Sequence, residues 1–321
     1  MCLVIKQLLI TCATLAPLVG CGQQPAEQPK AGARPVVRPP QPLLVPGTHV
    51  QLAPPTGFRL SAGFTRLERD KSTTITVVEL AGGSFYKTTR TFDPQEFKAK
   101  GVTVLDYQET HLGGYPAKYL YLQATAAAKT HILAFGDSTF TVLLTGLFSA
   151  SDEVAGQQIK QALFSSTYQK KALLAPFATA TFNVAVNESK FKFVHYSGSM
   201  YTYTAGKATD KMVPDRAVMV LVPLPTASES TASFAKYLMK RLAGNGLTNS
   251  LVKNESYVKV NGYNAYEAEV YGKLRGIDAL FYVLYLTHGE QSLFIQGITS
   301  DKYEENKKEF KKFTRAIRFK P

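Results

Sequence analysis

Runs of β-branched and aromatic residues dominate the hydrophobic pattern of the chain beyond residue 57. They include residues 74–78, 218–222 and 281–285, and their composition predicts β-strands. Several runs are apolar at almost every position rather than at alternate ones, which predicts sheet positions covered on both faces. The pattern therefore predicts an α+β fold, in which helices pack against antiparallel sheets.

Local signals predict where the helices begin and end. In residues 92–97 we expect Asp93 to cap a helix whose first position is Pro94, since proline fits the first helical turn. Gly101 is expected to end this short helix. A second helix is predicted over residues 230–243, where apolar residues recur every four positions.

The chain repeats an order of elements. Residues 111–122 and 259–270 share a Gly-Tyr-x-Ala turn, and each turn is preceded by a β-rich stretch and a helix. Two strands follow each turn, and Ser-Asp pairs at Ser151 and Ser300 open a final helix. Such an internal repeat predicts a duplication. We place the two similar domains at 57–172 and 173–321.

The N-terminal segment has the pattern of a secretory signal. Lys6 precedes the apolar residues 8–16, which are too few to span a membrane. Residues 18–21, Leu-Val-Gly-Cys, resemble the lipobox of bacterial lipoproteins. That resemblance implies cleavage of a signal peptide over residues 1–20 and a diacylglyceryl group on the sulfur of Cys21. Acylation, including palmitate, would then anchor the protein to a membrane.

Cysteine occurs only in this N-terminal part of the chain, at Cys2, Cys12 and Cys21. Cleavage removes the first two and the lipid occupies the third, so we expect no disulfide, thiol nucleophile or cysteine metal site. Gly22 follows in place of the aspartate of inner-membrane lipoproteins. By that resemblance we expect the bacterial cell envelope and, in a Gram-negative organism, the periplasmic face of the outer membrane.

Residues 21–56 are predicted to be the lipidated cysteine and a proline-rich linker, without helical or strand periodicity. The apolar residues 43–45 could dock locally, but a flexible stalk is the interpretation we favour.

The order of the elements also resembles a known fold. Residues 313–319, FTRAIRF, resemble the end typical of PsbP-like proteins, and residues 162–168, ALFSSTY, are a looser version. This family includes bacterial lipoproteins of the DcrB and LpqN types. The resemblance implies tandem PsbP-like domains, each an α/β/α sandwich with an antiparallel β-sheet flanked by helices, and a function in binding.

Motifs for catalysis are weak. The five histidines have no metal-ligand spacing, so we expect no metal and place them on the surface or at strand ends. Residues 135–139, FGDST, resemble the Gly-Asp-Ser block of GDSL lipases. The chain lacks the Asp-x-x-His of that family, and the same residues are typical of a hairpin turn. We therefore expect no enzyme, no catalytic residues and no cofactor.

The chain is basic, with a formal net charge of +13. Outside the cytoplasm nucleic acid is an unsuitable partner, whereas anionic lipid, an acidic glycan or a protein suits this charge. We consider two surfaces. The closing helix offers five cations to an anionic partner: Lys307, Lys308, Lys311, Lys312 and Arg315. A hairpin offers Tyr196, Tyr201 and Tyr203 to a partner, the alternative being that Tyr201 and Tyr203 only form one face of a strand.

These observations favour a lipid-anchored binding or assembly module of the envelope without catalytic activity, docking on a protein or an anionic component. Two alternatives stay open. One is a carrier of a small apolar ligand, and the other is a hydrolase whose site is assembled from dispersed residues.

Overall fold

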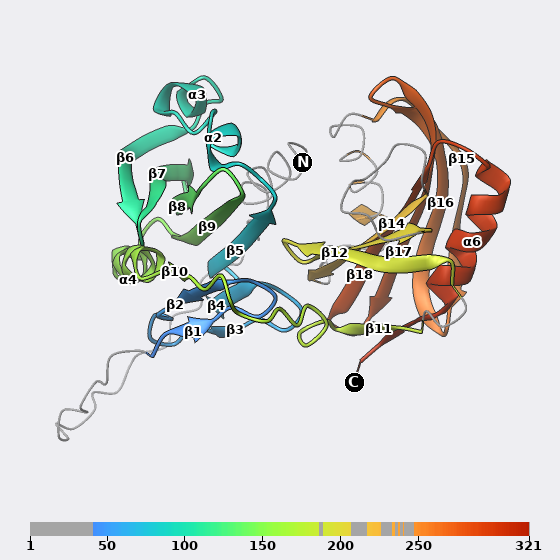
Figure 1. Cartoon of the computed structure of the whole chain (residues 1–321), viewed down its shortest axis with the longest axis horizontal. Coiled ribbons are helices and arrows are strands. Elements are labelled where there is room, and N and C mark those ends of the chain that lie inside the picture. The colour runs from blue at the N-terminus through green and yellow to red at the C-terminus, as the bar shows by residue number, and fades with distance from the viewer. Residues whose placement is uncertain are drawn as a thin grey trace.

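Two seven-stranded antiparallel sheets dominate the computed structural model, one in each half of the chain (Figure 1). The structure describes residues 41–185, 189–206, 217–225, 233, 234, 237, 240 and 247–320. The first sheet has the order β3-β4-β5-β9-β8-β7-β6 and the second the order β12-β13-β14-β18-β17-β16-β15. The two orders are the same when strands are matched along the chain. The predicted α+β fold with two similar domains is thus confirmed.

The strands of the first sheet are β3 (Arg59–Leu60), β4 (Arg66–Asp70), β5 (Thr73–Ala81), β6 (Thr103–Leu112), β7 (Tyr115–Thr125), β8 (Ala128–Gly136) and β9 (Phe140–Ser149). Those of the second are β12 (Phe191–Ser197), β13 (Met200–Ala205), β14 (Val218–Pro225), β15 (Leu247–Val260), β16 (Tyr263–Leu274), β17 (Ile277–His288) and β18 (Gln291–Thr299).

Helices α2 (Phe85–Thr88) and α3 (Pro94–Lys98) follow β5, and α3 begins as predicted, because the Asp93 side chain accepts a hydrogen bond from the Gln95 amide. Helices α4 (Glu153–Phe164) and α6 (Tyr303–Arg315) close the two domains. Of the helix predicted over residues 230–243, the structure describes 233, 234, 237 and 240, all of them helical.

Helices cover both faces of the first sheet. Ile159 of α4 belongs to the apolar core on one face, and Phe97 of α3 belongs to the core on the other. In the second domain Phe310 of α6 packs in one core, and Phe234 packs against the core on the opposite face. The double coverage explains why the strands carry near-continuous apolar runs.

The first domain begins earlier than predicted. Strand β2 (Val50–Leu52) pairs with β1 (Leu43–Leu44) and with β10 (Thr167–Tyr168), which follows α4. Val45, Val50 and Leu52 are completely buried in the core that α4 covers. The linker predicted over 21–56 is therefore wrong over its last part, because these apolar side chains complete the core. In the second domain β11 (Phe182–Val184) pairs with β19 (Ile317–Phe319) in the same way.

A hairpin joins the domains. Strand β12 reaches toward β5 in Figure 1, and the turn between β12 and β13 contacts the first domain. Ser197 Oγ donates a hydrogen bond to the carbonyl oxygen of Glu79. Ser199 Oγ accepts one from the Thr65 amide over 3.3 Å. Polar contacts thus fix the tip of this hairpin against β5 and against Thr65, the residue that precedes β4.

Candidate functional site

Helix α6 lies along one face of the second sheet and fixes the direction of its charged side chains (Figure 1). Phe310 and Phe313 are buried in the domain core. Asn306, also buried, donates a hydrogen bond from Nδ2 to Thr299 Oγ1 over 2.9 Å. Because these residues face the sheet, the remaining helix positions divide into flanking positions beside the sheet and outer positions.

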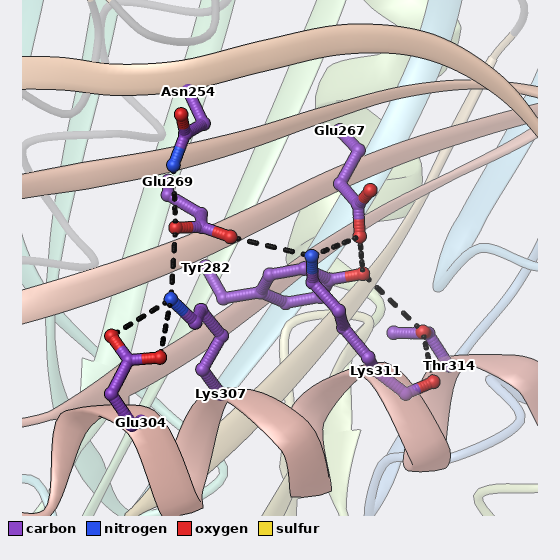
Figure 2. A network of polar contacts seen from close by, with 8 residues as sticks. All are labelled: Asn254, Glu267, Glu269, Tyr282, Glu304, Lys307, Lys311 and Thr314. Atoms are coloured by element: carbon purple, nitrogen blue, oxygen red, sulfur yellow. Dashed lines mark hydrogen bonds and ion pairs between the residues drawn. The ribbon is translucent and has the colours of Figure 1, made fainter.

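Two of the predicted cations lie at the flanking positions and face carboxylates of β16 (Figure 2). Lys307 Nζ is 3.2 Å from Glu269 Oε2, and Lys311 Nζ is 3.3 Å from Glu269 Oε1. Lys311 also lies 3.6 Å from Glu267 Oε1. Burial alone would raise the pKa of Glu269, but hydrogen bonds from Asn254, Lys307 and Lys311 hold that pKa below its usual value. The carboxylate is therefore charged and paired.

A buried tyrosine extends this network under the helix. Tyr282 Oη donates a hydrogen bond to Glu267 Oε1 over 2.8 Å and lies 3.4 Å from Thr314 Oγ1 (Figure 2). Burial raises the pKa of Tyr282 well above its usual value, so the hydroxyl keeps its proton. The network therefore holds two acidic groups and two lysines in fixed positions between sheet and helix.

The prediction of a surface of five cations therefore included two residues too many. Lys307 and Lys311 are engaged with the sheet and are not available to a partner as expected, because the register of β16 places carboxylates opposite them. Lys308, Lys312 and Arg315 are exposed. These three residues follow one another at helical spacing, i, i+4 and i+7, and so lie on one side of α6. We call them the outer stripe.

The first domain has a comparable site under α4. Its helix packs on Gly146, where an added Cβ would overlap with Ile159 Cγ2. In the second domain an added Cβ on Gly297 would lie 2.6 Å from Phe310 Cγ. These two close approaches occur at equivalent positions, so they show which residues of the two domains correspond: Gly146 to Gly297, and Ile159 to Phe310. The same alignment matches Tyr119 with Glu267, Tyr121 with Glu269, His131 with Tyr282, and Lys160 with Lys311.

Aromatic groups replace the carboxylates in the first domain. Tyr119 Oη and His131 Nδ1 lie 2.7 Å apart, and the His131 ring stacks on Tyr121 with centroids 4.4 Å apart. Lys160 Nζ lies 4.9 Å from the Tyr119 ring centroid. Burial, and next the charge of Lys160, lower the pKa of His131 to about 4. The expectation that every histidine lies on the surface or at a strand end is wrong here, because His131 is buried within β8.

The tyrosine hairpin is not a partner surface. Tyr201 and Tyr203 are buried in the core of the second domain, and Tyr201 Oη donates a hydrogen bond to the Pro176 carbonyl. The half-buried Tyr196 faces the first domain, since a Cβ added to Gly47 would lie 2.6 Å from its Cε1 atom. The prediction of a partner site is corrected, because Tyr201 and Tyr203 are buried in the core and the half-buried Tyr196 packs against the first domain.

A polar network in the first domain, close to this contact between the domains, was not predicted from the sequence. The carboxylate of Glu79, 6% exposed, accepts hydrogen bonds from the His49 amide and from Tyr168 Oη, at 2.8 and 2.7 Å. His49 Nδ1 lies 2.8 Å from the same carboxylate. The sequence signal for this network was Glu79 itself, a charged residue within the apolar strand β5. Its partners lie in other parts of the chain, so the sequence alone did not show how the charge is satisfied.

The Gly-Asp-Ser segment forms a turn between β8 and β9, as favoured from the sequence. Asp137 Oδ1 accepts hydrogen bonds from the Thr139 and Phe140 amides, at 2.7 and 3.2 Å. Within the described residues, no three histidine, cysteine or acidic side chains are grouped to hold a metal ion. No helix in that part of the chain is long and apolar enough to cross a bilayer. Cys21 lies outside the described residues.

No protein-family model and no curated protein matches the chain. Solved structures do match it. The Ran-binding protein Mog1p of Saccharomyces cerevisiae is 12% identical, over 43% of this chain and 90% of its own, with a TM-score of 0.33. LpqN of Mycobacterium tuberculosis, involved in cell envelope biogenesis, is 11% identical over 44% and 83%, with a TM-score of 0.35. The Pseudomonas aeruginosa immunity protein TplEi is 11% identical over 83% and 98%, with a TM-score of 0.29.

Proposed function

We propose that this chain is a lipid-anchored, non-catalytic binding module of a bacterial cell envelope. In this proposal the outer stripe of α6 docks on an anionic lipid surface. The observation that carries the proposal is the division of the helix cations. Lys307 and Lys311 are neutralised by Glu267 and Glu269, whereas the outer stripe is exposed on one side of the helix.

The expected attraction is modest. Each lysine or arginine close to an anionic membrane contributes about 1 kcal/mol, so the three residues contribute about 3 kcal/mol, roughly a hundredfold in affinity. Screening limits this attraction to contact range, since the Debye length is about 8 Å at physiological salt. A lipid on Cys21 would keep the helix near the membrane and raise its effective concentration there. The anchor and the stripe therefore act together.

Vesicle binding tests the proposal directly. The chain beginning at Gly22, which carries no lipid, is mixed with vesicles of phosphatidylglycerol and phosphatidylcholine or of phosphatidylcholine alone. We expect weak binding to the anionic vesicles only. The outer-stripe variant, in which Lys308, Lys312 and Arg315 are changed to Glu, should lose this binding.

A matched control separates the position of the charges from their number. Lys87, Arg90 and Lys98 are exposed cations of the first domain, and changing them to Glu alters the net charge by the same amount. This control variant should retain most of its vesicle binding. Equal losses in the two variants would show that only net charge matters and would reject the outer stripe as the docking surface.

A further inference from the structure

Strand β15 forms the outer edge of the second sheet. Among the described residues its one strand neighbour is β16. Residues 254–260 pair with β16 without interruption, whereas bulges disturb the pairing before Asn254. The regular part of this strand is largely accessible, and the side chain of Tyr257 is 58% exposed. An accessible edge of this kind can accept another strand.

Hairpin geometry determines which backbone groups of β15 are free. The turn between β15 and β16 consists of Asn261 and Gly262, with φ angles of 55° and 85°, as in a two-residue type I′ turn. In such a hairpin the flanking residues Val260 and Tyr263 form a hydrogen-bonded pair, and such pairs alternate along the strands. The amide and carbonyl groups of residues 255, 257 and 259 therefore point away from β16.

We infer that this edge pairs with the same edge of a second copy of the chain. The two strands run antiparallel about a two-fold axis at Tyr257. Tyr257 lies opposite Tyr257 of the second copy, and Glu255 lies opposite its Lys259. Each of these pairs joins residues whose free amide and carbonyl groups face one another, so each exchanges two backbone hydrogen bonds. The pairing joins two seven-stranded sheets into one.

The side chains on this edge are complementary to themselves. Residues 255, 257 and 259 lie on one face of the strand, because side chains alternate. The symmetric register places each glutamate opposite a lysine, and opposite charges in facing positions stabilise strand pairs. Lysine on an edge strand often opposes such pairing. Here the negative charge of Glu255 of the other copy compensates the positive charge of Lys259. Within its own chain Glu255 also accepts a hydrogen bond from Tyr266 Oη over 2.7 Å.

The corresponding edge of the first domain lacks this complementarity. Strand β6 carries Tyr107, Glu109 and His111 at the matching positions, next to the turn that leads into β7. Symmetric pairing would place Glu109 opposite Glu109 of the second copy, which is repulsive. Glu109 is already engaged by Tyr107 Oη and by Lys118 Nζ, which is 3.1 Å away. Of the two edges compared, only that of β15 is self-complementary, and symmetric pairing through this one edge gives a closed dimer rather than a filament.

Cysteine crosslinking of the full chain in its native membrane tests this dimer. In the proposed register the Cα atoms of the two Tyr257 residues are about 5.5 Å apart, within disulfide range. Tyr257→Cys should give a disulfide-linked dimer on mild oxidation. Glu109→Cys, at the matching position of the first domain, should not, and the parent chain controls for its own cysteines. Crosslinking of Tyr257→Cys no stronger than that of Glu109→Cys would overturn the inference.

A charge exchange then tests the register. Lys259→Glu, added to Tyr257→Cys, places two glutamates opposite each other and should lower the dimer yield several-fold. Changing Glu255 to Lys as well restores opposite charges and should restore most of the yield. A yield that does not respond to Lys259→Glu would contradict the register. The outer-stripe changes should leave the crosslink intact, so this test is independent of membrane docking.

Discussion

Ser197 donates a hydrogen bond from its side chain to the backbone carbonyl of Glu79, and this contact links the two domains. The side chain of Glu79 is held in turn by His49 and Tyr168. The first domain thus holds β5 in place, and β5 is the strand that the second domain contacts. Ser197, Glu79, His49 and Tyr168 each have a defined hydrogen-bond partner. The hairpin tip therefore makes a specific polar contact with the first domain rather than a loose apolar one.

Substitution at Gly47 should loosen this contact. Gly47 has a φ of 79°, and a Cβ there would lie 2.6 Å from Tyr196 Cε1. Gly82 has a similar φ of 72° but no heavy atom within 4 Å of an added Cβ. Both Gly→Ala changes cost about 1 kcal/mol of backbone strain, and Gly47→Ala adds a packing cost of about 1–3 kcal/mol. Small-angle scattering should show expansion for Gly47→Ala only. Equal behaviour of the two variants would contradict the role of Tyr196 in the contact.

Residues 43–52 should be required for the first domain to fold. Val45, Val50 and Leu52 are completely buried, and each such side chain contributes about 1.5–3 kcal/mol. A fragment of residues 41–172 should therefore unfold cooperatively in urea, whereas residues 57–172 should be several kcal/mol less stable or unfolded. Similar midpoints for the two fragments would mean that β2 adds little to the core. Cooperative unfolding of residues 173–321 would support the predicted boundary between domains.

Acid should destabilise the first domain through His131. Its pKa is about 4 in the fold and about 6.5 when unfolded. Between these values the unfolded chain binds a proton that the folded chain does not, so stability falls as the pH falls from about 6.5 toward 4. By pH 5 the loss amounts to about 2 kcal/mol.

Urea unfolding of the parent and of His131→Gln at pH 7.5 and pH 5 measures how much His131 contributes to this loss of stability. Carboxylates that also respond to acid are common to both proteins, so their effect cancels in the comparison. The parent should lose more stability than the variant between the two pH values. If both lose the same amount, His131 is not held neutral by its buried position.

The N-terminal anchor can be tested separately. Cys21→Ser removes the sulfur that the lipobox resemblance identifies as the lipid attachment point. The variant should accumulate as an unprocessed precursor and should incorporate no labelled palmitate. Normal processing with membrane retention would reject the predicted lipoprotein.

Local signals in the sequence were sufficient for much of the fold. Asp93 and Asp152 cap α3 and α4 through amides two and three residues ahead, so their neighbours alone identify them. The boundary of the first domain depended on distant contacts instead. Val50 pairs with Tyr168 across β2 and β10, and a proline-rich composition on either side concealed this strand.

The candidate site could be predicted only in part for a related reason. The closing helix was predicted from the sequence, and the helical spacing of Phe310 and Phe313 fits its buried face. Helical spacing did not separate Lys307 from Lys308, because that difference depends on where the sheet register places Glu269. Long-range register likewise decides the burial of His131. Sequence patterns define the faces of an element but not the residues that lie opposite them.

The salt dependence of membrane binding tests the central claim most directly. The affinity of the parent and of the outer-stripe variant for the same phosphatidylglycerol vesicles is measured as the sodium chloride concentration rises from about 50 mM to 500 mM. Over this range the Debye length shortens about threefold. At low salt the parent should bind the vesicles roughly a hundredfold more tightly than the outer-stripe variant. The affinities of the two proteins should converge as the salt concentration rises. A difference that persists unchanged at high salt, or no difference at low salt, would contradict docking through Lys308, Lys312 and Arg315.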